Sequence, residues 1–253
     1  MLKNILRKNT PLPDLTSVLI SGHGTGRISE SYKAIRTNIM HLLKDSESKT
    51  ILVTSPYANA GKTTTTANLA ITFAQLGKKV LMIDADMRRP SLHRLFSVVS
   101  DQGLSNVLTG SDYATAIMPT KYENLFILPA GCVPKNPSEL LLTPCFPKLL
   151  AKLSAEYDTI FIDAPPVDAV TDSVIISQKV TGTILVIRQN HTEKEALLRT
   201  INMLNSVNAN LLGYVLNAVD YNKFSYRYGH YYGNYSDKYS SYYADSSEES
   251  SEK

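Results

Sequence analysis

Short, nearly continuous apolar runs alternate along this chain with segments whose apolar residues recur at helical spacing. The runs read TILVT, KVLMID, LFILP, TIFID, GTILVIR and LLGYVLN, at residues 50–54, 79–84, 125–129, 159–163, 182–188 and 211–217. A strand with one wet face alternates apolar and polar residues, whereas unbroken Val, Ile, Leu and Phe indicate burial on both faces. The runs therefore predict the strands of a parallel sheet.

Helical patterns fill the intervals between these runs. The first is expected to start at Ser29, a residue type that caps helices, and continues to Leu43. The others cover residues 63–77, 138–142, 146–153, 172–178 and 194–205. Gly77 is a typical helix-ending residue. This order predicts an α/β fold with helices on both faces of the sheet.

The patterning divides the chain into three parts. Residues 1–28 combine prolines and glycines without sustained periodicity and are expected to form an N-terminal arm. Residues 29–220 are expected to form one domain, in line with 253 residues of which 43% are apolar. Residues 221–253 contain almost no aliphatic side chain, so this tail cannot offset the entropy of folding and is predicted to be disordered.

Composition excludes several classes of protein. The formal net charge of +3 is too small to indicate nucleic acid as a partner. No run approaches the roughly 18 apolar residues of a membrane span, and the first twenty residues lack the apolar block of a signal peptide, so we expect a cytoplasmic protein. Cys132 and Cys145 have no histidine or cysteine nearby at metal-ligand spacing, so neither a disulfide framework nor a zinc site is expected.

A phosphate-binding sequence joins the first predicted strand to the next helix. TSPYANAGKTTTTANLA contains Gly61-Lys62-Thr63, the second half of a P-loop whose first glycine would fall on Pro56. Backbone N–H groups at a helix N-terminus bind phosphate oxygens, a lysine reaches the terminal phosphates and the next hydroxyl ligates Mg²⁺. G-K-T also occurs by chance in surface turns, but the strand before it and the helix after it are the required context.

Acidic residues end two other apolar runs. Asp84, Asp86 and Arg88 lie in KVLMIDADMRRP, and Asp163 lies in YDTIFIDAPP. A lone aspartate at a strand end is commonly a helix cap or a turn residue. Here three acids are expected at the edge where parallel strands end, beside the P-loop, and ligands of open α/β sheets bind there. Carboxylates at this edge could hold Mg²⁺ and accept a hydroxyl proton during phosphoryl transfer.

These motifs, in this order, resemble those of the bacterial tyrosine kinases of the CpsD/CapB type (BY-kinases), which share a P-loop ATPase fold with the MinD/ParA/ArsA group. The matching segments are AGKTT, the D-x-D-x-R motif in VLMIDADMR, the Walker B motif in IFIDAPP, NPSELL at 136–141 and LGYVLN at 212–217. The resemblance extends from about Ser29 to the C-terminus. It implies an ATP- and Mg²⁺-dependent protein-tyrosine kinase that phosphorylates its own tail.

The resemblance also assigns site residues. The nucleotide-binding group is Asn59, Ala60, Gly61, Lys62, Thr63, Thr64 and Asn217. The catalytic group is Lys62, Asp84, Asp86 and Arg88, and the metal group is Thr63, Asp84, Asp86 and Asp163. Either Asp84 or Asp86 would be the base, and Asn217 would contact adenine or simply end the last strand in a turn. Many members have Pro-Gly where this chain has Ala58-Asn59, and we expect Asn59 to adopt the left-handed backbone of that turn.

The tail holds nine of the fifteen tyrosines. Without the resemblance it is equally well a low-complexity segment without a function, or one that self-associates. With it, the tail becomes the substrate. The expected phosphoacceptors are Tyr226, Tyr228, Tyr231, Tyr232, Tyr235, Tyr239, Tyr242 and Tyr243.

Partners follow from the resemblance as well. The family's E-x-x-R-x-x-R motif, which packs protomers into a ring, appears as Glu30, Lys33 and Arg36, and lysine lacks the bidentate fork of arginine. A ring would favour transfer between subunits. The family further implies a membrane-embedded adaptor of the polysaccharide co-polymerase type, which activates the kinase, recruits it to the inner face of the membrane and serves capsule or exopolysaccharide synthesis and export.

Two other functions fit the same fold, namely a ParA/MinD-like ATPase switch and a non-catalytic scaffold for a membrane partner. The switch class carries an extra lysine early in its P-loop, where this chain has Tyr57. A scaffold would have no need to keep Lys62 together with the three acids. We therefore favour the kinase.

Overall fold

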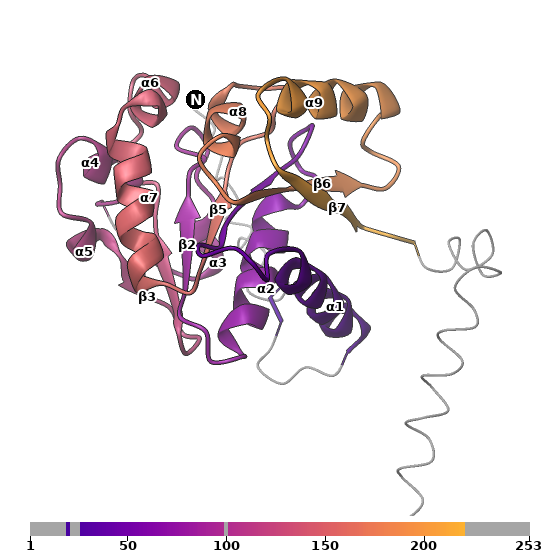
Figure 1. Cartoon of the computed structure of the whole chain (residues 1–253), viewed down its shortest axis with the longest axis horizontal. Helices are drawn as coiled ribbons and strands as arrows, with labels where there is room; N and C mark the ends of the chain where they lie inside the picture. Colours follow the sequence, from indigo (N-terminus) through magenta and orange to yellow (C-terminus); the bar gives the residue numbers. More distant parts are fainter. Residues whose placement is uncertain (1–18, 21–25, 99–100, 221–253) are drawn as a thin grey trace, which may run out of the picture.

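The computed structural model describes residues 19–20, 26–98 and 101–220, and its centre is a seven-stranded sheet with the order β3-β4-β2-β5-β1-β6-β7 (Figure 1). The strands are β1 Thr50–Thr54, β2 Val80–Asp84, β3 Met118–Pro119, β4 Leu125–Leu128, β5 Thr159–Asp163, β6 Gly182–Arg188 and β7 Leu211–Asn217. All neighbouring pairs are parallel except β3 with β4. The predicted parallel sheet is confirmed, with one short antiparallel edge strand that the sequence pattern did not reveal.

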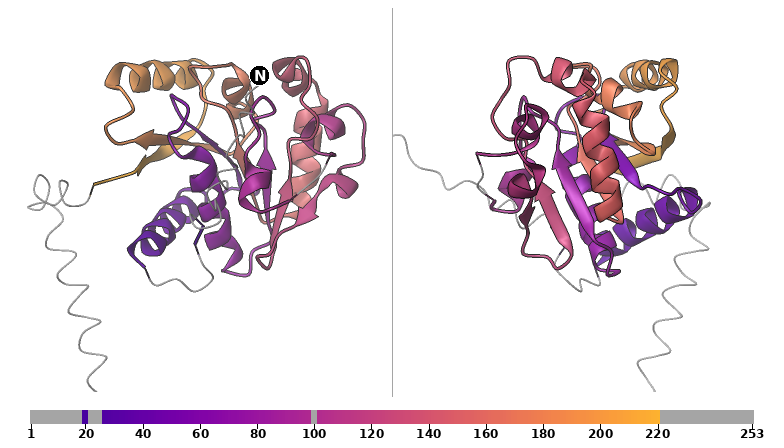
Figure 2. Two further views of the ribbon diagram at one scale, coloured as in Figure 1. Left: turned by 180° about the vertical axis from the view of Figure 1, so that it is seen from behind. Right: turned by 60° about the vertical axis from the view of Figure 1, so that its left-hand side comes forward.

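Helices cover both faces of this sheet, as the two views of Figure 2 show. They are α1 Arg27–Leu42, α2 Lys62–Ala74, α3 Leu92–Leu95, α4 Leu104–Leu108, α5 Tyr113–Ala116, α6 Pro137–Leu142, α7 Cys145–Glu156, α8 Asp172–Ser177 and α9 Lys194–Ser206. The predicted helices are confirmed. The short α3, α4 and α5 were not predicted, because four or five residues are too few to show a helical period.

The core lies in two layers because successive strand residues point to opposite faces. Ile51 and Val53 of β1 join α1 and α2 in one apolar cluster, whereas Leu52 joins α7 and α8 in the other. All five residues of β1, β2 and β5 are buried. Burial on both sides explains why these runs are continuously apolar.

The first helix starts earlier than predicted. It begins at Arg27 with Gly26 as its N-cap, and the Glu30 N–H donates to the Gly26 carbonyl at 3.1 Å. Ser29 lies inside the first turn, buried, so its expected role as the cap is wrong. The prediction for Gly77 is confirmed, because it has a φ of 74° and its N–H donates to the Ala74 carbonyl at 2.9 Å.

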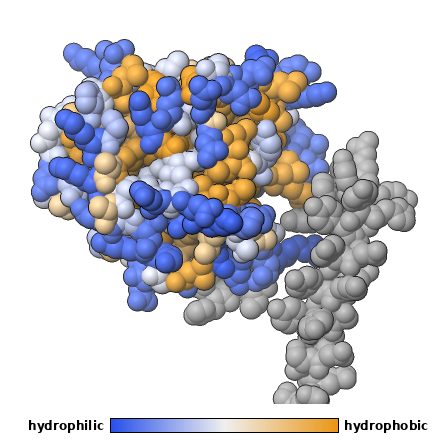
Figure 3. Space-filling model, viewed as in Figure 1, coloured by the Kyte–Doolittle hydropathy of each residue, from blue (hydrophilic) through white to orange (hydrophobic). Residues whose placement is uncertain are grey.

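The last strand also departs from the sequence-based expectation of burial on both faces. β7 pairs only with β6 among the described residues, and Tyr214 and Leu216 are about half exposed. An edge strand has a neighbour on one side only, so its apolar sequence is not matched by burial. Apolar residues accordingly reach the surface in this part of the molecule (Figure 3).

Parts of the predicted arm and the whole predicted tail lie outside the described residues, and with the tail lie the eight expected phosphoacceptors from Tyr226 to Tyr243. Leu19 and Ile20 of the arm are buried, and the Ile20 N–H donates to Asn68 Oδ1 on α2 at 2.8 Å. Across the described ranges, none of the helices is both long and apolar enough to cross a membrane.

Candidate nucleotide and phosphotransfer site

The phosphate-binding loop spans residues 55–61, between β1 and α2. Its turn depends on two residues in the left-handed region, Asn59 with a φ of 60° and Gly61 with a φ of 94°. The expectation for Asn59 is thereby confirmed. A Cβ on Gly61 would lie 2.0 Å from Asn217 Nδ2, so this position requires glycine on grounds of both backbone angle and space.

The loop directs the N-terminus of α2 at the site. Lys62 is the first residue of this helix and is only 8% exposed, and Thr63 and Thr64 follow in the same turn. No side chain caps the first turn among the described residues. Unpaired N–H groups, the helix dipole and a lysine together form a site for an anion such as a phosphate group.

Two predicted carboxylates face each other across neighbouring strands. Asp84 ends β2, Asp163 ends β5, and the two are directly opposite in register. Asp84 is fully buried and accepts hydrogen bonds from the backbone N–H groups of Asp86, Ser91 and Leu92, at 3.2, 3.1 and 3.0 Å. Its oxygens therefore serve mainly to hold the loop that follows β2.

Asp163 joins the Walker B strand to the P-loop helix. Its Oδ2 accepts the Thr63 hydroxyl at 2.6 Å, whereas Oδ1 is buried and has no hydrogen-bond partner among the described residues. An unpaired buried carboxylate oxygen is costly and indicates a missing partner. The arrangement fits a metal-bound water beside Thr63, as Mg²⁺ usually keeps several waters and few protein ligands. In the described ranges, no three His, Cys, Asp or Glu side chains could hold a metal by themselves.

Burial dominates the electrostatics of these acids. It raises the pKa of Asp84 to about 8, with the facing Asp163 adding to the effect. Burial also raises the pKa of Asp163 to about 6, although Lys62 and the Thr63 hydroxyl oppose this shift. The pKa of Asp86 is raised by burial as well. Without a bound cation, Asp84 is therefore expected to keep its proton at neutral pH.

The raised pKa values of Asp84 and Asp163 predict that the stability of the protein depends on pH. An unfolded aspartate ionises near pH 3.9, so the folded protein binds more protons than the unfolded one between about pH 4 and pH 8. Stability conferred by the protonated acids is therefore lost as pH rises through this window. We expect the urea midpoint of the ligand-free protein to fall from pH 6 to pH 8.5, and Asp84→Asn to flatten the fall. A slope in Asp84→Asn equal to that of the wild type would contradict the assignment.

Asp86 differs from the other two acids in its access to ligand. It lines a cavity of about 700 Å³ that the P-loop residues also line. Its Oδ1 accepts the Arg89 backbone N–H at 3.0 Å. The rest of the lining is Ala58, Asn59, Gly61, Lys62, Thr63, Thr64, Arg88, Arg89, Ser91, Leu95, Pro165, Pro166, Ala169 and Val170. The cavity thus brings together most of the predicted site.

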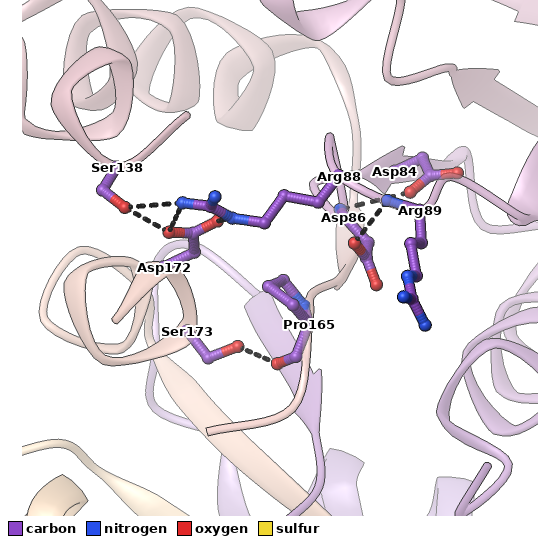
Figure 4. Close-up of polar contacts among 8 residues, drawn as sticks. All are labelled: Asp84, Asp86, Arg88, Arg89, Ser138, Pro165, Asp172 and Ser173. Carbon is purple, nitrogen blue, oxygen red and sulfur yellow. Dashed lines mark hydrogen bonds and ion pairs between the residues drawn. The ribbon is translucent and has the colours of Figure 1, made fainter. Parts of the chain in front are cut away.

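Arg88 is committed to contacts that the sequence did not reveal. Its Nε lies 3.1 Å from Asp172 Oδ2 and its Nη2 lies 3.1 Å from Ser138 Oγ, while Ser138 also donates to Asp172 (Figure 4). Asp172 is fully buried at the start of α8. Ser138 belongs to the segment NPSELL. Asp172 was not predicted as a site residue, although its position as an acid at the start of a predicted helix could have indicated it. The cluster fastens the loop after β2 to α6 and α8.

Asn217, a predicted site residue, and Arg188, which the sequence analysis did not predict, support the P-loop backbone. Asn217 Nδ2 donates to the Ala60 carbonyl at 2.9 Å, and Arg188 Nη1 donates to the Asn59 carbonyl at 2.9 Å. Both residues end strands at the same edge of the sheet, β7 and β6. Its place at the end of a predicted strand, on the edge that carries the site, could have indicated Arg188 from the sequence. The contact between Asn217 and adenine stays a prediction.

The predicted interface residues lie on α1 in two environments. Glu30 and Lys33 pair with each other at 2.7 Å on the surface, whereas Arg36 Nη1 donates to the Thr72 carbonyl of α2 at 2.7 Å. An apolar groove of about 340 Å³ runs between α1 and β7. The ring contact stays a prediction, and Arg36 already has a partner within the protomer.

The fold and the site define a P-loop nucleoside-triphosphate-binding protein, with its loop between a central strand and a helix and acids on two adjacent strands. A family profile described as AAA domain (AAA_31) matches residues 48–212. The chain is 39% identical over 205 residues to putative tyrosine-protein kinase CapB of Staphylococcus aureus, covering 81% of this chain and 90% of CapB. It is 37% identical over 227 residues to tyrosine-protein kinase YwqD of Bacillus subtilis, covering 89% and 95% of the two chains.

Its fold also matches the crystal structure of the chimerical protein CapA2B2. The TM-score is 0.76 at 37% identity, over 80% of this chain and 90% of the other. The chain belongs to the bacterial tyrosine-protein kinases. The predictions of family, of a P-loop fold and of a protein-tyrosine kinase are thereby confirmed.

Proposed function

We propose that this chain transfers the γ-phosphoryl group of ATP to tyrosines of its own C-terminal tail, with Mg²⁺ as the metal. The observation that carries the proposal is the single cavity in which Lys62, Thr63 and the Asp86 carboxylate meet. A phosphate-binding helix terminus, a lysine and a reachable carboxylate are the parts that phosphoryl transfer to a hydroxyl requires.

The P-loop side of the cavity binds the nucleotide. Lys62 contacts the β- and γ-phosphates, Thr64 the α-phosphate, and the backbone of residues 59–61 surrounds the phosphate oxygens. Thr63 and Asp163 would hold Mg²⁺, with Asp84 on the neighbouring strand fixing the loop beside them. When bound, Mg²⁺ neutralises charge that develops on the phosphates.

We assign the base to Asp86 and not to Asp84. Asp84 is fully buried and accepts three backbone N–H groups. Asp86, by contrast, lines the cavity, and its Oδ1 accepts the backbone N–H of Arg89. The raised pKa of Asp86 increases its affinity for a proton. In the reaction, the tyrosine oxygen bonds to the γ-phosphorus, the bond to ADP breaks, and the phenolic proton passes to Asp86.

The acceptors are the tail tyrosines. The tail follows Asp220, three residues after β7 ends at the edge of the sheet that carries the site. A flexible chain of this length reaches on the order of 30 Å. Its many closely spaced hydroxyls favour productive encounters with a site on the same or a neighbouring subunit.

The partner, the location and the cellular process are proposed from the family resemblance. A membrane-embedded adaptor of the polysaccharide co-polymerase type would bind the kinase, activate it and hold it at the inner face of the membrane. The process served would be capsule or exopolysaccharide synthesis and export. A ring of subunits would pass phosphate between neighbours through their tails.

A mixing experiment tests transfer between subunits. Full-length Lys62→Met protein supplies tails without activity, and an active chain ending at residue 220 supplies activity without a tail. Incubated together with ATP and Mg²⁺, they are expected to yield phosphotyrosine on the Lys62→Met tails, while each protein alone yields none. If the mixture also stays unmodified although the full-length wild type labels itself, transfer occurs within a subunit.

A further inference from the structure

Arg88 and Arg89 follow the proposed base, Asp86, in the sequence, but their side chains differ in how far other residues engage them. Arg88 points to Asp172 and Ser138 and uses both Nε and Nη2 in those contacts (Figure 4). Arg89 extends in another direction, on the side of the Asp86 carboxylate. Within the described part of the chain, the Arg89 guanidinium has no hydrogen-bond or ion-pair partner. Both arginines line the cavity, but Arg89 has its whole guanidinium available to a ligand, whereas Arg88 is held by Asp172 and Ser138.

The position of Arg89 matches the space where phosphate would react. Its side chain lines the 700 Å³ cavity together with Lys62, Thr63 and Asp86. Its backbone N–H donates to Asp86 Oδ1 at 3.0 Å, which fixes the start of the Arg89 side chain relative to the base. Lys62 enters the cavity from the P-loop, whereas Arg89 enters from the loop after β2, so the two cations stand on different elements of the same cavity.

A cation beside the transferred group accelerates phosphoryl transfer. In the transition state, negative charge spreads over the equatorial oxygens of the moving group. A guanidinium presents several donors in a planar fork that matches such oxygens, and it remains charged at every relevant pH. An unpaired arginine is thus suited to this charge and requires no bond of its own to be broken first.

We infer that Arg89 is a further catalytic residue, whose guanidinium contacts the γ-phosphoryl group as it leaves ADP, and that Arg88 is a positioning residue. The inference rests on the proposed kinase function. While the tyrosine oxygen bonds to phosphorus and its proton passes to Asp86, Arg89 neutralises charge on the transferred group. Its contribution belongs to the transition state more than to ground-state binding of ATP.

The test compares Arg89→Ala and Arg89→Lys with Arg94→Ala in the full chain. Arg94 is a matched control, because it is an exposed arginine on the nearby α3 that does not line the cavity. Three quantities are measured: kcat and KM for tyrosine phosphorylation, the rate of ATP hydrolysis, and the Kd of ADP with Mg²⁺. Urea midpoints check folding, and all three variants are expected to unfold as the wild type does.

We expect Arg89→Ala to lower kcat for tyrosine transfer and for hydrolysis by about 100-fold or more, with the Kd of ADP within about threefold of wild type. Arg89→Lys should restore part of the rate, because it keeps the charge and loses the fork. Arg94→Ala should match the wild type. An unchanged kcat in Arg89→Ala, or a change confined to the KM of the acceptor or to nucleotide affinity, overturns the inference.

The hydrolysis readout separates this inference from the proposed function. If the wild type hydrolyses ATP and forms no phosphotyrosine, the kinase proposal fails. The loss of hydrolysis in Arg89→Ala would still support contact between Arg89 and the γ-phosphoryl group. If phosphotyrosine forms normally in Arg89→Ala, the kinase proposal stands and the role of Arg89 is wrong.

Discussion

Lys62→Met is expected to lower tyrosine phosphorylation by on the order of 1,000-fold or more while the protein stays folded. Methionine has a similar length and an apolar stem, so it replaces the aliphatic part of Lys62 in its nearly buried position. What is lost is the one charged side chain among residues 55–64, which we propose contacts the terminal phosphates. That cation also opposes the rise in the pKa of Asp163, so its removal should leave the acids more fully protonated.

The measurement is the initial rate of phosphotyrosine formation at saturating ATP, with the urea midpoint as the test of folding. Lys78→Met is the matched control, since Lys78 is about half exposed beyond the end of α2, and its one ion pair with a described residue is a long one to Asp158, at 3.9 Å. It should retain the wild-type rate. A rate for Lys62→Met within tenfold of that control would refute the P-loop assignment.

Asp86→Asn carries the second large expected effect. An asparagine side chain keeps the size of Asp86 and can still accept the Arg89 N–H through its carbonyl oxygen, but it cannot take up the tyrosine proton. Removing a general base typically costs about 10²–10⁴ in rate. We expect kcat to fall by that factor, with little change in the affinity for ADP and Mg²⁺.

Asp84→Asn should behave differently, because Asp84 is buried and bonded to the backbone of residues 86, 91 and 92. Its main effects are expected on stability and on affinity for nucleotide with Mg²⁺. Asp45→Asn, on the exposed surface, serves as a control for the substitution itself. If Asp84→Asn eliminates transfer at full nucleotide affinity while Asp86→Asn remains active, the two assignments must be exchanged.

The sequence predicted site residues correctly where a general rule of sheet topology says which distant residues lie close together. Apolar strands ending in Asp84 and Asp163 were expected at one edge of a parallel sheet, and the two residues are directly opposite in the structure. Left-handed Asn59 followed from the chemistry of its turn in the same way. Both arguments use local pattern together with one general rule.

Contacts between distant loops could not be predicted in this way. Arg88 and Asp172 are 84 residues apart, and their pairing depends on how α8 packs against the loop after β2. The cap at Gly26 was missed because a glycine offers no side-chain signal, while Ser29 had the preferred residue type. The exposure of β7 depends on strand order, which its apolar sequence does not encode.

The position of Arg188 illustrates the same limit. A cation at the end of a buried strand was visible in the sequence, but its hydrogen bond to the Asn59 carbonyl joins residues 129 apart. Together with Asn217 it holds the P-loop from the other side of β1. These two contacts hold the P-loop through its backbone carbonyls.

The central claim is that the phosphate site acts on the chain's own tyrosines. Its most direct test is incubation of the purified protein with ATP and Mg²⁺, followed by mapping of phosphotyrosine by mass spectrometry, beside Lys62→Met as the inactive reference. We predict phosphate on tyrosines between Tyr226 and Tyr243 in the wild type and none in Lys62→Met. ATP hydrolysis by the wild type with no phosphotyrosine in the tail would contradict the claim and identify the chain as an ATPase switch.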